Sequence, residues 1–472
     1  MIDWSKFDWA LLSPELIIFG TAILVIVIDL IMPKAKGISG WLTIIGLLAG
    51  LSSTFTLRQG ELFGGMLVMD NLAIFSKQLL LAITIVVTLS SLDYVKKFLV
   101  NKGEYYCLLL FATLGMLFMV SAAEFITLFI SLELASLICI ILTGYLKKDP
   151  KSAEAGVKYL LFGVLSSAIL LYGMSFLYGL TGSTFIKDIS PDTLSPIVLL
   201  GIVLLIAGFG FKIAAVPFHM WVPDTYEGAP TPITTYLATA SKVAGFVVIL
   251  RVFMVCFMNI KVEWTILIAV LSVLSMGIGN LCALSQTNIK RMLAYSSIAH
   301  AGYILIGLAV TSEVGIASII LYLLVYSLAS LGAFLVVIAF SNQTGSDTIE
   351  DYAGLWKRAP LLALAMLLSL VSMAGIPPLA GFIGKFYLFA GAIKQGLIWL
   401  PVVGVLFSVV SVYYYFMVVK TMYFKEPKDS TPIIMGKPLS LGIFIAVISI
   451  IVIGIYPAPF LNWAMIAIKS LF

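Results

Sequence analysis

The chain has 472 residues, of which 61% are hydrophobic and only 11% are charged; its net charge is +5 and its mean hydropathy is +1.12. A soluble globular protein needs about a quarter of its residues charged to cover its surface. The composition therefore excludes a secreted disulfide scaffold, a nucleic-acid-binding protein and any sizeable water-soluble catalytic domain. It predicts an all-α polytopic membrane protein.

Apolar stretches follow one another along almost the whole chain. They fall at 12–32, 38–57, 70–92, 105–121, 124–146, 155–180, 194–218, 229–258, 263–285, 293–311, 315–340, 360–395, 398–423 and 438–468. At about 20 residues a span, they predict about fourteen transmembrane helices. The apolar residues do not alternate with polar ones as in a membrane barrel, so strands are not expected. The first stretch has no basic region before it, which favours a retained helix over a signal peptide.

Lysine and arginine in the loops indicate the orientation. One set of alternate loops holds sixteen of them: Lys34, Lys36, Lys96, Lys97, Lys102, Lys147, Lys148, Lys151, Lys290, Arg291, Lys357, Arg358, Lys420, Lys425, Lys428 and Lys437. The other side holds six: Lys6, Arg58, Lys187, Lys261, Lys394 and Lys469. By the positive-inside rule the first set is cytoplasmic, and both termini are expected on the outer side.

Six basic residues remain, and they lie inside or at the ends of the predicted spans: Lys77, Lys158, Lys212, Lys242, Arg251 and Lys385. A lysine at mid-membrane costs about 3 kcal/mol on insertion scales and is a functional candidate by default. Lys77 and Arg251 lie near helix ends, where their charged heads are expected to snorkel to the interface. Lys158 stands one turn into its span and fits either interpretation.

Lys212, Lys242 and Lys385 are surrounded by apolar residues, beyond the reach of a snorkelling side chain. Glu133 lies well inside the fifth span, where an isolated carboxylate must be protonated or paired. These four residues are the main candidates for function. Three further acids lie near span ends and are interpreted as interface residues: Asp29, Glu104 and Glu124.

Helix breakers accompany two of these lysines. GFGFKIAAVP at 208–217 contains Lys212, and AGIPPLAGFIGK at 374–385 ends in Lys385. Proline removes a backbone donor, so each span is expected to break where protein or a wet cavity satisfies the backbone. Broken helices five spans apart favour two inverted five-helix repeats, with ordinary proline kinks as the alternative. The predicted segments are an N-terminal three-helix segment 1–104, repeats 105–258 and 259–423, and a C-terminal helix 424–472.

The chain offers few residues for a bound cofactor. His219 and His300 titrate near neutrality and suit either a proton relay or a structural role. The cysteines form no C-x-x-C pair and are interpreted as buried apolar residues: Cys107, Cys139, Cys256 and Cys282. Gly384-Lys385 lacks the upstream glycine and the following Ser or Thr of a phosphate-binding loop. We therefore expect no metal, nucleotide or flavin site in this chain.

A row of protonatable groups at mid-membrane indicates a proton path. Burial disfavours a charged lysine, whereas a nearby carboxylate favours it. At about 6 Å and an effective dielectric constant near 20, that coupling is roughly 3 kcal/mol. We expect Glu133 to pair with Lys212, Lys242 to be an intermediate relay, and Lys385 to be the terminal donor or acceptor.

Three long segments carry a resemblance to a known family. FKIAAVPFHMWVPDTYEGAPTPITTYLATASK at 211–242, NIKRMLAYSSIAHAGY at 288–303 and AGIPPLAGFIGKFYLF at 374–389 resemble the proton-antiporter-like membrane subunits of respiratory complex I. The likeness extends over nearly the whole chain. Within the family, PDTYEGAPTPIT followed by ATASK resembles the N-type branch, as does SPELIIFGTAILVIVIDL near the start. Lys385 stands where the M-type subunit typically carries Glu, and the chain lacks the long lateral helix of the L-type.

The resemblance implies a role for each candidate. The family's proton channel corresponds to Glu133, Lys212, Lys242 and Lys385. Further polar positions of the family correspond to Lys158, His219 and His300. The family's complex oxidises NADH, or in some relatives ferredoxin or another donor, and reduces quinone. NAD, FMN, iron–sulfur clusters and quinone are therefore expected in partner subunits and not in this chain, and a bacterial plasma membrane is the expected location. M-like and K/J-like membrane subunits and the lipid bilayer are the expected partners, with no nucleic acid.

Three other functions stay open at this point. The same fold serves as a component of Mrp-type cation/proton antiporters and as a membrane subunit of related hydrogenase or formate-oxidising complexes. A third possibility is a structural subunit whose charges only brace helices. Bracing predicts that Lys212→Ala disrupts assembly, whereas a channel role predicts normal assembly with lost pumping.

Overall fold

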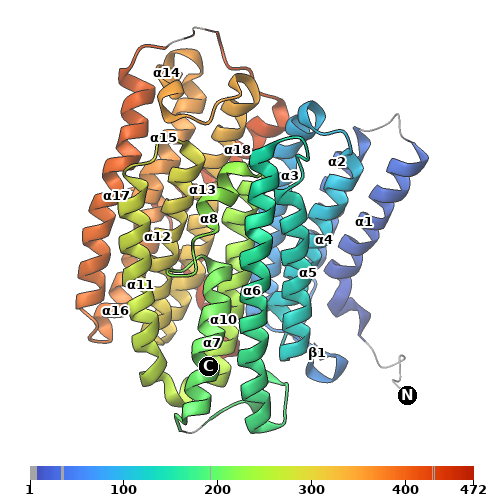
Figure 1. Cartoon of the computed structure of the whole chain (residues 1–472), viewed down its shortest axis with the longest axis vertical. Coiled ribbons are helices and arrows are strands. Elements are labelled where there is room, and N and C mark those ends of the chain that lie inside the picture. Colours follow the sequence, from blue (N-terminus) through green and yellow to red (C-terminus); the bar gives the residue numbers. More distant parts are fainter. Residues whose placement is uncertain (1–7, 33–36, 192, 428, 430) are drawn as a thin grey trace.

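The computed structural model describes residues 8–32, 37–191, 193–427, 429 and 431–472. Long helices run side by side along the long axis of the molecule (Figure 1). Among the described residues, twelve helices are long and apolar enough to cross a membrane, and two shorter apolar helices, Ile38–Thr54 and Pro360–Ala374, accompany them. The prediction of a helical, multi-pass membrane protein is confirmed.

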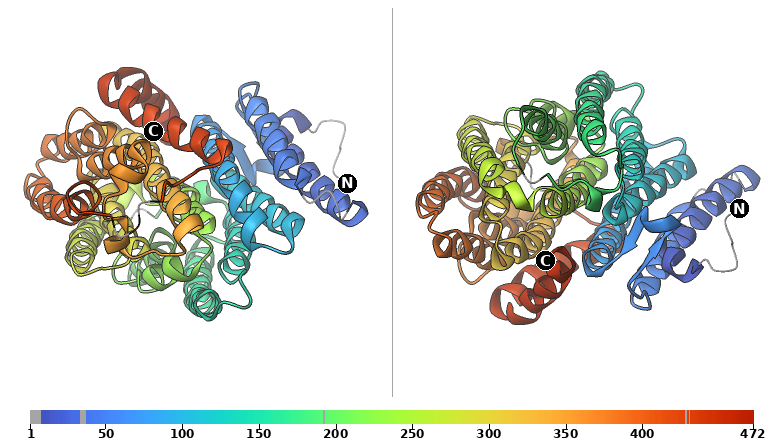
Figure 2. Two further views of the ribbon diagram at one scale, coloured as in Figure 1. Left: turned by 90° about the horizontal axis from the view of Figure 1, so that it is seen from above. Right: turned by 90° about the horizontal axis from the view of Figure 1, so that it is seen from below.

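The helices follow one another along the chain in this order. The helices of the first half are α1 (Ser13–Ile31), α2 (Ile38–Thr54), α3 (Asn71–Phe98), α4 (Lys102–Ser121), α5 (Phe125–Thr143), α6 (Pro150–Thr181), α7 (Pro196–Ile213), α8 (Val222–Gly228) and α9 (Thr231–Tyr236). The second half holds α10 (Lys242–Cys256), α11 (Lys261–Ala283), α12 (Ile289–Val310), α13 (Glu313–Thr344), α14 (Leu355–Arg358), α15 (Pro360–Ala374), α16 (Ala380–Lys394), α17 (Trp399–Phe424), α18 (Lys437–Ile455) and α19 (Ala458–Ile468). Seen along the bundle, α1 lies at one edge (Figure 2). Among the described spans, α12, α13 and the segment from α9 through α10 are the most deeply buried, so they form the centre of the bundle.

A short β-hairpin corrects the expectation that the chain has no strands. β1 (Gly60–Leu62) pairs antiparallel with β2 (Leu67–Met69). Each strand has only three residues, too few to give an alternating pattern in the sequence. Leu62 and Leu67 pack with Leu11 and Leu12 in a small apolar cluster, so the hairpin covers the beginning of the first helix.

Both described chain ends lie at the same end of the bundle. Leu11 and Leu12 pack on the hairpin that leads directly into α3. Near the C-terminus, the side chain of Ser470 hydrogen-bonds to Asp70, which caps the N-terminus of α3. The chain therefore crosses the bundle an even number of times. Four lysines used for the orientation prediction lie outside the described residues: Lys6, Lys34, Lys36 and Lys428.

The helical path breaks at both places that the glycines and prolines predicted. α7 ends at Ile213 in a left-handed residue, Ala214 (φ 64°), and α8 begins at Val222. α15 ends at Ala374 in Gly375 (φ 85°), and α16 begins at Ala380. Each break therefore has its turn next to one of the buried lysines.

The backbone freed at the breaks is bound inside the protein. Val216 N donates to Ser275 Oγ at 2.9 Å, and Trp221 Nε1 donates to the Phe211 carbonyl at 3.1 Å. Backbone polar groups at membrane depth need such partners because lipid offers none. The breaks are thus stable parts of the fold, and they leave helix ends inside the bundle.

Candidate functional site

Lys212 occupies the last turn of α7, next to the first break. Its side chain is 3% exposed, and its Nζ donates to Ser136 Oγ on α5 at 2.8 Å. The unpaired carbonyls at the C-terminus of a helix stabilise a positive charge nearby. The break therefore places Lys212 at a helix C-terminus inside the bundle, where the free carbonyls stabilise its positive charge.

Glu133 lies on α5 one turn before Ser136, on the same face of the helix. It is half-buried and accepts a hydrogen bond from Ser167 of α6. Glu133, Ser136 and Lys212 line one cavity of about 20 Å³ between α5, α6 and α7. The predicted neighbourhood of Glu133 and Lys212 is present, but the ion pairs of the described residues do not include a direct bridge between them. Both residues line the same small cavity instead.

Lys242 begins α10, directly after a π-helical turn at Leu237–Ser241. It is 2% exposed; its Nζ donates to the Ser297 carbonyl of α12 and lies 5.9 Å from the centre of the Tyr326 ring. Gly245, one turn later, packs against the stem of Lys212: a Cβ there would lie 3.3 Å from Lys212 Cγ. The two lysines are thus held by adjacent turns of packed helices.

His300 is the centre of a hydrogen-bonded group in the second half. Its Nδ1 lies 2.8 Å from the Tyr322 hydroxyl, and its Nε2 lies 3.2 Å from the Tyr415 hydroxyl. Tyr415 is also hydrogen-bonded to Ser296. The His300 ring stands 5.0 Å from that of Tyr326, the ring beneath Lys242. Imidazole and hydroxyl groups both donate and accept hydrogen bonds, so this group suits proton transfer.

Lys385 lies on α16 at the second break and is 5% exposed. Its Nζ donates to the Ala374 carbonyl at the end of α15 at 3.0 Å and to Ser408 Oγ at 3.1 Å, and it stands 4.5 Å from the centre of the Tyr303 ring. A Cβ on Gly375 would lie 2.8 Å from Lys385 Cδ, so only glycine leaves room for the lysine stem. A mainly apolar groove of about 370 Å³ reaches Lys385 and Ser408 between α16 and α17.

Lys158 lies apart from this buried row, in a charged cluster at an open pocket of about 170 Å³. It pairs with Asp224 of α8 at 2.6 Å, and Asp224 also pairs with Arg291 of α12 at 2.6 Å. Glu227 joins Arg291 to Lys151 at 3.0 and 2.9 Å. The ion pairs of this cluster hold α6, α8 and α12 together beside the open pocket.

Three aromatic rings pack together at the Lys212 cavity, and two of them, Tyr159 and Phe211, line it. Tyr159 stacks on Trp221 with ring centres 4.4 Å apart, and Phe211 lies against Trp221 at 5.0 Å. His219, in the break before Trp221, is half-buried, and its Nδ1 has no hydrogen-bond partner among the described residues. The contacts of the described residues do not join His219 to the lysine row.

Sequence reasoning missed several members of the site. Asp224 and Glu227 stand in the PDTYEG segment, where two acids beside a span were a usable signal. Ser136 follows Glu133 by three residues, which also indicates a shared helical face. Tyr322 and Tyr415 gave no signal, since tyrosine is common throughout the chain.

Two basic residues contradict the expectation of snorkelling. Lys77 is fully buried in an ion pair with Glu15 of α1. Arg251 is buried too, and it forms two hydrogen bonds of 2.9 Å with Asp70. Burial raises the pKa of Asp70, but the charge and hydrogen bonds of Arg251, together with hydrogen bonds from Ala73 N and Ser470, bring the pKa below its usual range. Both pairs fasten α3 to its neighbours, α1 in one case and α10 in the other.

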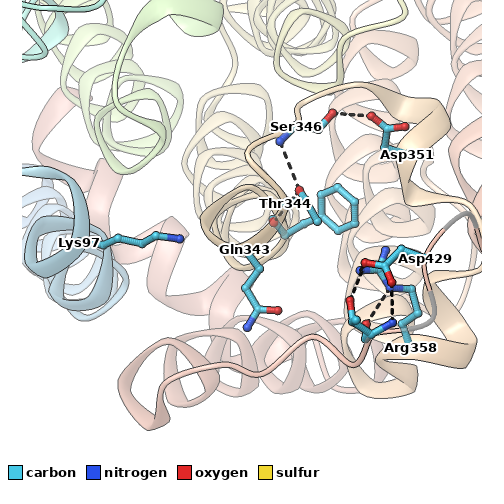
Figure 3. Close-up of a pocket in the computed structure, with 9 residues that line it drawn as sticks. Lys97, Gln343, Thr344, Ser346, Asp351, Arg358 and Asp429 are labelled. Atoms are coloured by element: carbon cyan, nitrogen blue, oxygen red, sulfur yellow. Dashed lines mark hydrogen bonds and ion pairs between the residues drawn. The ribbon is translucent and has the colours of Figure 1, made fainter.

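A surface pocket of about 630 Å³ lies elsewhere, beside α14 (Figure 3). Ser346 donates to Asp351 at 2.6 Å, and Arg358 lies 3.7 Å from Asp429. The residues that line this pocket include Lys97 and Gln343 but not the buried Lys212, Lys242 or Lys385. Within the described ranges, His, Cys, Asp and Glu side chains do not gather in threes as a metal site requires.

Comparisons with known proteins agree on one family. The family model described as "NADH:quinone oxidoreductase/Mrp antiporter, TM" matches residues 122–411. The chain is 48% identical to NADH-quinone oxidoreductase subunit N of Desulforamulus reducens, over 98% of this chain and 99% of that one. It is 46% identical to the protein of the same name from Heliobacterium modesticaldum, over 98% and 100%.

Solved structures give the same fold. A chain of respiratory complex I from Thermus thermophilus matches with a TM-score of 0.82 and 30% identity, covering 95% of this chain and 98% of that chain. A chain of the Mrp complex from Dietzia matches with a TM-score of 0.89, covering 97% of both chains, but at 20% identity. The second match shows the fold alone.

Proposed function

The chain belongs to the family of NADH:quinone oxidoreductase and Mrp antiporter membrane subunits, and we propose that it carries protons across the membrane as the N-type subunit of a quinone-reducing complex. Electron transfer in other subunits drives the movement. The chain contributes the membrane path and none of the redox chemistry.

One observation carries this proposal: Lys212, Lys242 and Lys385 are all buried in the bundle. Packed turns bring Lys212 next to α10, and rings and hydroxyls around His300 continue from Lys242 towards Lys385. A buried lysine row of this kind is costly to insert and has no value for packing. A proton that is bound and released by the three amines one after another gives this lysine row a function.

The proposal includes a topology. Fourteen spans follow if α7 with α8, and α15 with α16, each count as one broken span. Inverted repeats over 105–258 and 259–423 then put Lys212 and Lys385 in corresponding positions. An even number of crossings agrees with the chain ends meeting at one end of the bundle. The lysine-rich loops face the cytoplasm of a bacterium, and both termini face outward.

In the proposed complex, neighbouring subunits carry the cofactors and cover part of the surface of this chain. NAD, FMN, iron–sulfur clusters and quinone belong to partner subunits. Glu133 is half-buried on α5 near exposed apolar residues of the same helix, Ile130 and Leu137, where a K/J-like membrane neighbour would cover it. The groove at Lys385 is the corresponding opening on the side of an M-like neighbour. Lipid covers the remaining apolar faces.

The proton path is tested by Lys212→Ala in the assembled complex, with Lys187→Ala, an exposed residue of the segment before α7, as the control. Sealed vesicles report proton pumping and donor:quinone turnover, and a blot reports assembly. The proposal predicts normal assembly with pumping and coupled turnover both lost in Lys212→Ala alone. Normal pumping in that variant would reject the path. Failed assembly would support the bracing alternative.

A further inference from the structure

Tyr159 of α6 has a buried hydroxyl with no role in the packing. Its side chain is 1% exposed, and the hydroxyl has no hydrogen-bond partner among the described residues. The ring is held by Trp221, with the two planes only 7° apart. Phenylalanine would make the same stack, and an unpaired buried hydroxyl costs about 1–3 kcal/mol. The hydroxyl therefore needs an explanation other than stability.

The surroundings of Tyr159 supply one. It lines the same cavity of about 20 Å³ as Glu133 and Lys212. A space of this size holds about one water molecule if two to four polar groups bind it. A hydroxyl, a carboxylate and an ammonium group meet that condition.

We infer that Tyr159 positions a single water molecule that bridges Lys212 and Glu133. This rests on the proposed proton path, which it deepens. One N–H bond of the Lys212 ammonium breaks as its proton passes to the water oxygen. The water gives one of its own protons to a Glu133 oxygen. The step leaves a neutral amine, a carboxylic acid and an unchanged water, and Tyr159 keeps its proton throughout. Its hydroxyl fixes where the water stands.

The test compares Tyr159→Phe with Tyr352→Phe in the assembled complex. Tyr352 is the matched control because it too is fully buried and stacked, 3.9 Å from Phe340, with an unpartnered hydroxyl. It lies outside the lining of the Lys212 cavity. We expect Tyr159→Phe to assemble normally and to pump about five- to tenfold more slowly, the loss that one hydrogen bond accounts for. Tyr352→Phe should pump normally.

Infrared difference spectra of the same complexes, recorded with H₂¹⁸O exchange, report the water directly. A buried-water O–H band that shifts with ¹⁸O should be present in the wild type and in Tyr352→Phe, and absent in Tyr159→Phe. Normal pumping with an unchanged band in Tyr159→Phe would overturn the inference. That outcome, combined with lost pumping in Lys212→Ala, would leave the proton path intact. Normal pumping in Lys212→Ala would reject both.

Discussion

The polar groups around Lys212 and those around His300 are arranged in different ways. In the first half, Lys212 and Glu133 each bind a serine, and both residues line one small cavity. In the second half, His300 makes direct contact with two tyrosine hydroxyls. A proton can cross the second group by rearranging existing hydrogen bonds, whereas the first needs water or side-chain movement.

This difference indicates where control resides. A gap that water or a moving side chain must bridge can be opened and closed by a small shift of α5 or α7. A chain of direct hydrogen bonds conducts whenever its ends exchange protons. We therefore expect the partner subunits to act on the first half, where Glu133 also reaches the chain surface.

The largest effect is expected at the end of the second half. Lys385→Ala removes the amine held by Ala374 O and Ser408 Oγ, and with it the proposed terminal proton carrier. A positioned proton donor contributes about 100-fold or more, so pumping should fall by at least about that factor. Vesicle acidification measures it, with Lys394→Ala as an exposed control on the same helix. Equal pumping by the two variants would remove Lys385 from the path.

Breaking the direct hydrogen bonds should cost somewhat less. His300→Ala removes two contacts, to Tyr322 and Tyr415. Two neutral hydrogen bonds of about 1 kcal/mol each correspond to roughly a 30-fold slower proton flux. His219→Ala is the comparison, because that imidazole stands outside the row, and it should change the flux less. A larger loss in His219→Ala would reverse the assignment.

A third variant tests the first half. Ser136→Ala deletes the hydrogen bond to Lys212 Nζ while keeping the fold of α5. Since a hydrogen bond to a charged group contributes about 1.5 kcal/mol at the lower end of its range, pumping should slow by roughly tenfold. Ser175→Ala, at an exposed position of α6, is the control. No difference between the two serines would mean that Ser136 does not hold the lysine in the working complex.

The smallest effect is expected in the charged cluster. Asp224→Asn weakens the partly exposed ion pairs of Asp224 with Lys158 and Arg291. Each base keeps a second acidic partner, Glu154 for Lys158 and Glu227 for Arg291. Exposed ion pairs contribute about 0–1 kcal/mol, so pumping should fall by no more than about fivefold, and the loss should vary with salt. Turnover measured between low and high ionic strength checks this. A salt-independent, complete loss would make Asp224 part of the buried path itself.

The sequence was most informative where a residue contradicted its surroundings. Lys212, Lys242 and Lys385 stand out because charge is expensive in an apolar stretch, and the breaks beside two of them follow from glycine and proline. The tyrosines that bind His300 were not predictable. Tyr415 lies 115 residues away from His300 in the chain, and no local pattern records a contact of that range.

Two wrong expectations have the same cause. Lys77 and Arg251 lie near helix ends, and that position alone favours snorkelling. Their partners Glu15 and Asp70 come from other parts of the chain, and Asp70 is 181 residues from Arg251. Because these partners are distant in the chain, the sequence did not reveal that Lys77 and Arg251 form buried ion pairs that hold α3 against its neighbours. The three-residue strands of the hairpin were likewise too short to leave a pattern.

Lys242 is where the two halves meet, since it lies one turn from the contact with Lys212 and above the ring next to His300. The most direct test of the account is therefore proton pumping by sealed vesicles carrying Lys242→Ala, related to quinone reduction and to assembled complex. If the halves form one path, the complex assembles, and pumping and coupled turnover both fall by more than about tenfold. Assembled complex that pumps at the normal rate would contradict the account.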